Sequence, residues 1–170
     1  SDSGVVTYVQ TAMRKLVASD AEKTLIFCTR DATETHWQKL CAEFDAHGLP
    51  EPEKVGIPGG SSDKEFWEIF KTVNKQISKE AEIVFDVTHS FRSLPLIMSV
   101  LLNYLEVVKG TKLVGCYYGA FETLGKAADV EKKYPDPADR RAPIVDLTPF
   151  FQLNDWVKAI RDFKRFGDAG

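Results

Sequence analysis

The sequence predicts an α/β domain built on a Rossmann-like, mostly parallel sheet with helices on both faces. Apolar β-branched runs alternate along the chain with longer segments whose apolar residues recur at helical spacing. The run 83–87 is nearly continuous in apolar residues, as expected of a parallel strand covered on both faces. With 170 residues, 44% of them hydrophobic, the chain can form one full core of this kind.

The first part of the chain alternates helix and strand. Residues 5–18 repeat apolar side chains at helical spacing, which predicts an opening helix. Because domains of this class normally open on a strand, we expect a first strand that this sequence does not include. A strand is predicted over 24–29. The helix after it, 31–48, begins with Asp31 and Glu34, a pair that resembles a capping box.

The middle of the chain contains the most apolar elements. A strand over 54–58 leads into a helix over 62–77, which opens on a serine–glutamate capping box. The strand 83–87 leads into the helix 94–108, which ends before Gly110. This helix is apolar almost all round, so we expect it to be buried on most sides.

The last part of the chain is more polar. A strand is predicted over 112–119, followed by a charged, proline-containing excursion over 122–142 that we expect to be mobile. Residues 143–148 form the last predicted strand, and an amphipathic helix follows within 150–170.

Composition and absent motifs exclude several function classes. The net charge of −3 argues against a nonspecific binder of long nucleic acid. Cys28 and Cys116 fall in predicted strands and no cysteine pair has metal-binding spacing, which indicates reduced thiols in a cytoplasmic protein. No apolar run reaches the roughly 20 residues that span a bilayer. Without a dinucleotide, P-loop, serine-hydrolase or zinc motif, we expect no cofactor and no metal.

Polar residues follow each predicted strand at its carboxyl end, and parallel strands bring such segments to one edge of a sheet. Hydroxyls, glycines, an arginine, a histidine and aromatic rings gather there, a set suited to phosphates and bases. The candidate ligand-binding residues are Thr29, Arg30, Gly59, Gly60, Ser61, Ser62, Thr88, His89, Ser90, Phe91, Arg92, Ser93, Tyr118, Gly119, Ala120 and Phe121.

Each of these groups also has a structural interpretation. Gly59–Ser62 is equally typical of a loop that leads into a capped helix. His89 fits a structural histidine, and Arg92 fits an ion pair with Glu122. Single aromatic residues after the strand 112–119 are more often core or interface. The helix 94–108 suits either the core or a homodimer interface.

The assembled segments resemble CRISPR-associated Rossmann-fold (CARF) domains, and most nearly the Csx-type subgroup of type III CRISPR ancillary proteins. The resemblance spans nearly the whole chain, and its most specific part is the run DVTHSFRSLP. It rests on VFDVTHSFRSLPL, NYLEVVKGTKLVGCYYGAFE, FCTRDATETHWQKL, IPGGSSDKEFWEIF and IVDLTPFFQLNDWVKAIRDFKRFGDA. Such domains are dimeric sensors of cyclic oligoadenylate, which lies across the two-fold axis and switches a fused effector.

The resemblance implies a sensor domain over 1–149 and a linker helix over 150–170 that leads toward an effector domain. Phosphate and ribose would contact Thr88–Ser93, and the adenines would lie against Gly59–Ser62 and Tyr118–Phe121. The implied ligand is cyclic tetra-adenylate, and the implied partners are a second copy and the effector, with no membrane. The family's first strand and its glycine-rich loop are absent.

Two further activities remain open from the sequence. Ring cleavage needs an in-line 2′-hydroxyl and fixed donors, and His89 as general base with Arg92 as charge stabiliser are the candidate catalytic residues. We expect a sensor first, with slow metal-independent ring-nuclease activity as the alternative. A mononucleotide-using Rossmann-like enzyme is the candidate from another class.

Overall fold

The structure, a computed structural model, describes residues 4–89 and 94–167, and its elements confirm the predicted α/β class. The candidate residues Ser90, Phe91, Arg92 and Ser93 lie outside this described part. The helices are α1 (Val9–Leu16), α2 (Arg30–Ala46), α3 (Asp63–Gln76), α4 (Leu94–Lys109), α5 (Ala127–Lys133) and α6 (Thr148–Phe166). The strands are β1 (Leu25–Cys28), β2 (Glu53–Gly56), β3 (Glu82–Asp86), β4 (Lys112–Gly119) and β5 (Ile144–Asp146), with 3-10 turns η1 (Phe121–Leu124) and η2 (Pro137–Asp139).

Within residues 4–89 and 94–167, the strands form two separate hydrogen-bonded pieces instead of one continuous sheet. β1 pairs with β2 in parallel, and β4 lies between β3, which is parallel to it, and β5, which is antiparallel. α2 packs against α1 and β1, whereas α4 packs against α3 and β4. Helices thus cover both pieces of the divided sheet, in agreement with the predicted Rossmann-like α/β class.

One apolar cluster joins the two pieces. Its buried members come from α3, α4 and the residue that follows β2: Ile57, Ile69, Val73, Met98, Leu101 and Leu105. Phe27 of β1 and Phe85 of β3 both pack against this cluster. The helical layer of α3 and α4 therefore supports both sheet pieces.

Two local predictions need correction. Asp31 does not cap α2, because the Oγ1 atom of Thr29 accepts the hydrogen bond from the Ala32 N–H at 3.3 Å. The charged segment 122–142, for which no helix was predicted, contains most of η1 together with α5 and η2. Its expected mobility stays a prediction. By contrast, Ser62 caps α3 through the Glu65 N–H at 3.3 Å, as its capping box predicts.

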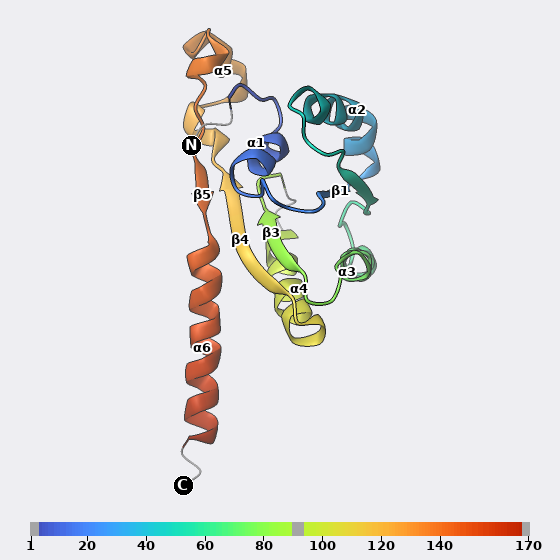
Figure 1. The fold of residues 1–170 in the computed structure, drawn as a ribbon, viewed down its shortest axis with the longest axis vertical. Helices are drawn as coiled ribbons and strands as arrows, with labels where there is room; N and C mark the ends of the chain where they lie inside the picture. The colour runs from blue at the N-terminus through green and yellow to red at the C-terminus, as the bar shows by residue number, and fades with distance from the viewer. Residues whose placement is uncertain (1–3, 90–93, 168–170) are drawn as a thin grey trace.

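The helix α4 is not buried on most sides, because its apolar residues face both the core and solvent. Leu101 and Leu105 are fully buried, whereas Leu96 is 73% exposed and Val107 is 84% exposed. α6 extends beyond the rest of the fold in Figure 1 and exposes a second apolar stripe. We call these two stripes the α4–α6 apolar surface, which consists of Leu96, Val100, Tyr104, Val107, Val108, Phe150, Leu153, Trp156, Val157, Ile160, Phe163 and Phe166.

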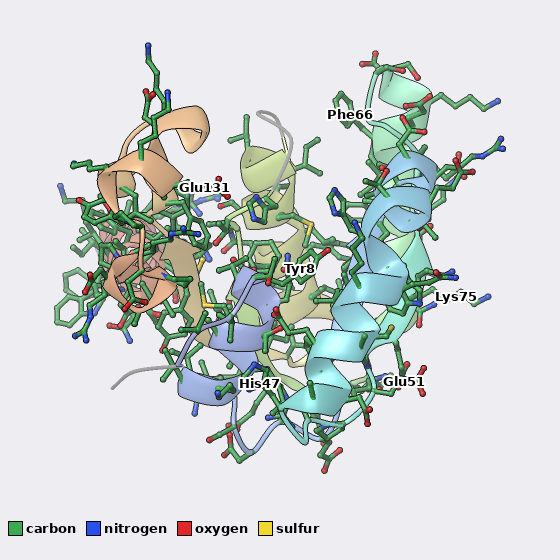
Figure 2. All side chains as sticks on the ribbon, turned by 90° about the horizontal axis from the view of Figure 1, so that it is seen from above. Tyr8, His47, Glu51, Phe66, Lys75 and Glu131 are labelled. Carbon is green, nitrogen blue, oxygen red and sulfur yellow. The ribbon has the colours of Figure 1, made fainter. Side chains whose placement is uncertain are left out.

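A carboxylate of α2 anchors the start of α1. The Glu43 oxygens accept hydrogen bonds from the Thr7 N–H at 2.7 Å, the Tyr8 N–H at 3.0 Å and the Thr11 hydroxyl at 2.6 Å. Tyr8 lies beside α2 in Figure 2. Burial alone raises the pKa of the Glu43 carboxyl, but these hydrogen bonds outweigh it and lower the pKa below its usual value.

Replacing Glu43 by glutamine should lower the free energy of unfolding at pH 7 by about 1–2 kcal/mol, because charge-assisted hydrogen bonds are lost. The folded-state pKa of Glu43 is depressed, so this stabilisation is fully present above the usual glutamate pKa of about 4.3 and disappears as the pH falls through the lower folded value. Chemical denaturation at pH 7 and pH 3 measures both effects. Asp45→Asn on the same helix is the control, and a destabilisation by Glu43→Gln that is equal at both pH values would contradict this account.

Candidate functional site

The turn after β3 is fixed by a polar contact between neighbouring strands. The Oδ1 atom of Asp86 accepts hydrogen bonds from the Thr88 N–H at 2.9 Å and the Thr88 hydroxyl at 2.5 Å. The Thr88 Oγ1 atom in turn accepts from the Gly119 N–H, at the end of β4, at 2.8 Å. One threonine hydroxyl therefore both holds its own turn and ties the ends of β3 and β4 together.

The same arrangement recurs on the other side of β4. The Oδ1 atom of Asp146 accepts from the Thr148 N–H at 2.8 Å, and the Thr148 Oγ1 atom accepts from the Cys116 N–H at 2.9 Å. Hydrogen bonds from Thr148 lower the pKa of Asp146, so its carboxylate stays ionised. The sequence signal for both turns is Asp-x-Thr directly after an apolar strand, which the sequence analysis did not interpret as a turn motif.

Gly119 is required by close packing at this edge. A Cβ atom at this position would lie 2.8 Å from the Cγ2 atom of Val9 and 3.1 Å from the Cε2 atom of Phe121. It would also lie 3.3 Å from the Thr88 Oγ1 atom. The first residue of α1, the end of β4 and the Thr88 turn therefore meet at one point that only glycine fits without displacement.

His89 and Phe121 form an aromatic pair across the ends of β3 and β4. Their ring planes differ by 4° and their centroids are 6.0 Å apart, an offset-stacked geometry. Two rings that sandwich a base must leave about 7 Å between their planes, twice the carbon–carbon contact distance of about 3.5 Å. An adenine would therefore stack on an outer face of this pair, where His89 and Phe121 are both exposed.

Tyr118, near the end of β4, directs its phenol hydroxyl to Glu122. Its hydroxyl donates a hydrogen bond to the Oε2 atom of Glu122 at 2.7 Å, and this bond raises the pKa of Tyr118. Glu122 was the proposed ion-pair partner of Arg92, whose placement is outside the described residues. Thr88, His89, Tyr118, Gly119 and Phe121 are thus brought together at the carboxyl ends of β3 and β4.

Gly59–Ser62 serves as the start of α3. The Glu65 carboxylate accepts from the Ser61 N–H at 2.8 Å and from the Ser61 hydroxyl at 3.1 Å. Those contacts lower the pKa of Glu65. Since the donors of Ser61 and the acceptor of Ser62 are used within the cap, the structural interpretation of this segment has direct support, and its role as an adenine contact stays a prediction.

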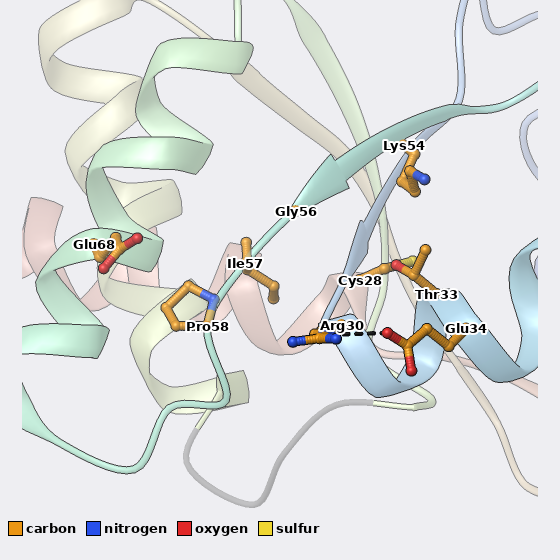
Figure 3. A pocket seen from close by; sticks show the side chains of 9 residues that line it. All are labelled: Cys28, Arg30, Thr33, Glu34, Lys54, Gly56, Ile57, Pro58 and Glu68. Carbon is orange, nitrogen blue, oxygen red and sulfur yellow. Dashed lines mark hydrogen bonds and ion pairs between the residues drawn. The ribbon is translucent and has the colours of Figure 1, made fainter.

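The candidate residue Arg30 lies at a separate cleft of about 410 Å³, at the carboxyl ends of β1 and β2 (Figure 3). Its guanidinium Nε is paired with Glu34 at 2.8 Å on the protein surface. The other side chains and backbone that form the cleft belong to Cys28, Thr33, Lys54, Gly56, Ile57, Pro58 and Glu68. Thr29, the partner of Arg30 in the prediction, instead caps α2.

Several residues of this cleft were not predicted from sequence patterns. Lys54 supplies a second cation, and its Nζ also lies 5.4 Å from the Trp37 ring centroid. Glu34 and Glu68 supply carboxylates. Burial raises the pKa of the Cys28 thiol, which disfavours a thiolate nucleophile there. A lysine or glutamate inside a strand or helix carries no local sequence signal that it will face a cleft.

Phe121 and Glu122 also line a second cleft of about 360 Å³, together with Leu124, Gly125, Val130, Glu131 and Arg140. Within the described residues, no group of three or more histidine, cysteine, aspartate or glutamate side chains is arranged to hold a metal ion. The described helices include none with the length and apolar composition needed to cross a bilayer.

The sequence is similar to a curated protein whose name links it to CRISPR systems. It is 32% identical over 116 residues to the CRISPR-associated protein MJ1674 of Methanocaldococcus jannaschii. The similarity covers 66% of this chain and 16% of that protein, so it concerns a small part of a much larger polypeptide. No family model matches the sequence. The similarity supports a relationship to CRISPR-associated proteins.

Replacing Thr88 by valine should lower the free energy of unfolding by about 1–3 kcal/mol, because the Asp86 carboxylate and the Gly119 N–H each lose a partner. Thr88→Ser keeps the hydroxyl and should retain most of the stability. Urea denaturation of the three proteins measures this. If the valine and serine variants were equally stable, the hydroxyl would not hold the two strands together.

Proposed function

We propose that this chain is a sensor domain that binds cyclic oligoadenylate, most suitably cyclic tetra-adenylate, in CRISPR antiviral defence. The relationship to a CRISPR-associated protein supports the role in CRISPR defence. The main support for a nucleotide ligand is that the Thr88 turn and the stacked His89–Phe121 pair lie together at the ends of β3 and β4. The cyclic ligand and the number of its adenylates come from the resemblance to CARF domains.

The chemistry of this edge suits a nucleotide. The exposed imidazole of His89 offers a hydrogen bond or a positive charge to phosphate, next to a flat aromatic face for adenine. α4 begins at Leu94, shortly after this turn, and free N–H groups at a helix start favour anions. The nearby cleft beside Arg30 and Lys54 adds cations, partly offset by its two glutamates.

A second copy of the chain would cover the α4–α6 apolar surface. Exposed apolar surfaces of this extent mark protein–protein contacts. A two-fold dimer would present the same turn twice, so each protomer would bind half of a cyclic ligand. In this proposal residues 1–149 are the sensor. Residues 150–170, which include most of α6, are the linker that transmits binding to a fused effector domain.

Isothermal calorimetry with cyclic tetra-adenylate, cyclic hexa-adenylate, linear tetra-adenylate, AMP and ATP tests the ligand. We expect cyclic tetra-adenylate to bind most tightly. His89→Ala and Arg92→Ala should each weaken binding by roughly 1–3 kcal/mol through loss of a charge-assisted hydrogen bond. His47→Ala is the matched control, because His47 lies at the end of α2 that is away from Arg30. Tighter binding of AMP or ATP than of any ring would replace this proposal with a mononucleotide-using enzyme.

Light scattering tests the dimer. The unmodified chain should have the mass of a dimer. Val107→Glu and Trp156→Glu should make it a monomer, because each places a charge within the apolar surface. Lys75→Glu, away from this surface on α3, should leave the dimer intact. An unmodified chain that stays monomeric with saturating cyclic tetra-adenylate would rule out this assembly.

Chromatography after incubation of excess protein with cyclic tetra-adenylate separates a sensor from a ring nuclease. We expect the ring to remain intact over many hours at high occupancy, as for a sensor. A linear product with a 2′,3′-cyclic phosphate, absent with His89→Ala while binding persists, would instead assign His89 as general base. Loss of such a base typically reduces a rate by about 10²–10⁴-fold.

A further inference from the structure

α6 is attached to the rest of the fold at two separate places. Its first residue is fixed to β4, because the Thr148 Oγ1 atom accepts a hydrogen bond from the Cys116 N–H at 2.9 Å. Further along the helix, the side chain of Lys158 is only 34% exposed and reaches α4. Apart from Phe151 and Lys158, which are half-buried, residues 149–166 are exposed. α6 therefore meets the fold along a narrow line that ends at Lys158.

The ammonium group of Lys158 joins α6 to two residues of α4. It donates a hydrogen bond to the Oδ1 atom of Asn103 and lies 3.9 Å from the Oε2 atom of Glu106. The same Asn103 oxygen also accepts from the Nδ2 atom of Asn154, in α6, at 3.4 Å. Asn103 is held in turn by its own helix, since its Nδ2 atom donates to the Ser99 carbonyl at 2.8 Å. We call the contacts among Asn103, Glu106, Asn154 and Lys158 the Lys158 junction.

α6 turns a polar face toward α4 at this junction. Residues three, four or seven apart share one face of a helix, so Asn154 and Lys158 lie on the same face. Trp156, Ile160 and Phe163 have the same spacings, but they lie on a different face of α6 and are exposed. Beyond Phe151, polar contacts therefore hold α6 in its place beside α4.

We propose that α6 is a lever that pivots at Thr148 on β4 and is moved at Lys158 by α4. α6 is one continuous helix from Thr148 to Phe166. At a rise of about 1.5 Å per residue, Lys158 lies about 15 Å from the pivot and Phe166 about 27 Å from it. A shift of α4 by about 1 Å relative to β4 would therefore move Phe166 by about 1.8 Å. Helix shifts of about 1–2 Å are a common form of switching in proteins.

The lever links the proposed ligand edge to the far end of α6, and this link rests on the proposed function. α4 follows the Thr88 turn along the chain, and the Thr88 Oγ1 atom ties that turn to Gly119 of β4. A ligand at this edge would therefore contact the two elements between which α6 is held. If it binds one arrangement of α4 and β4 more tightly, it shifts the direction of α6 accordingly. The Lys158 junction itself is independent of which ligand binds.

Residual dipolar couplings of the backbone amides, measured by NMR on weakly aligned protein, test the junction without any ligand. These couplings report the direction of α6 relative to β4. Lys158→Met and Asn103→Leu should each reduce the couplings of residues 159–166 at least about twofold, because the helix then samples a range of directions. Asn103→Asp, which keeps the acceptor oxygen, and Lys164→Met, further along α6, are the controls and should leave the couplings unchanged. Unchanged couplings in both Lys158→Met and Asn103→Leu would overturn the proposal.

The same couplings at saturating cyclic tetra-adenylate test the lever as a whole. We expect the ring to change the direction of α6 relative to β4 in the unmodified chain. Lys158→Met should still bind the ring in calorimetry, but without this change in direction. Binding that leaves the direction of α6 unchanged in the unmodified chain would overturn the lever. Absence of binding would instead contradict the proposed function, and the ligand-free couplings would still decide whether the junction sets the direction of α6.

Discussion

The hydrogen bond between the Gly119 N–H and the Thr88 hydroxyl is the contact on which the carboxyl edge depends. The Asp86 carboxylate orients that hydroxyl, and the missing side chain of Gly119 lets the start of α1 and the Phe121 ring approach. Thr148 forms the corresponding contact with Cys116 in the interior of β4. There, burial and the nearby carboxylates raise the pKa of the Cys116 thiol to about 11, so it stays protonated. The central strand is therefore held by threonine hydroxyls on both sides.

Local sequence patterns predicted most elements because their causes are local. Ser62 and Glu65 form the expected cap, and the apolar run of β4 forms a strand with the predicted bounds. Asp31 was predicted to cap α2 because Asp31 and Glu34 resemble a capping box. The cap is instead Thr29, the residue that directly follows β1. Periodicity could not show that Val107 faces solvent, because apolar side chains look alike whether a core or a partner covers them.

Part of the candidate site was predictable because its residues directly follow strands. Thr88, His89 and Phe121 follow strands that topology brings side by side, so the general rule for α/β sheets found them. Lys54 lies inside a strand, and its place in the cleft depends on residues that are distant from it in the sequence, such as Arg30 and Glu68. The divided sheet was also beyond local patterns, since strand pairing depends on contacts between distant segments. β3, which pairs with β4 in the described part of the chain, is only partly buried despite its apolar run.

The most direct test of the account is where the ligand binds on the chain. Titration of isotopically labelled protein with cyclic tetra-adenylate, followed by NMR chemical shifts, maps the contacts residue by residue. The account predicts the largest changes at Thr88, His89 and Gly119–Phe121, with smaller ones at Arg30 and Lys54. Saturable changes confined to the second cleft around Val130 and Arg140, or to α6, would contradict it, and so would the absence of any change at saturating ring.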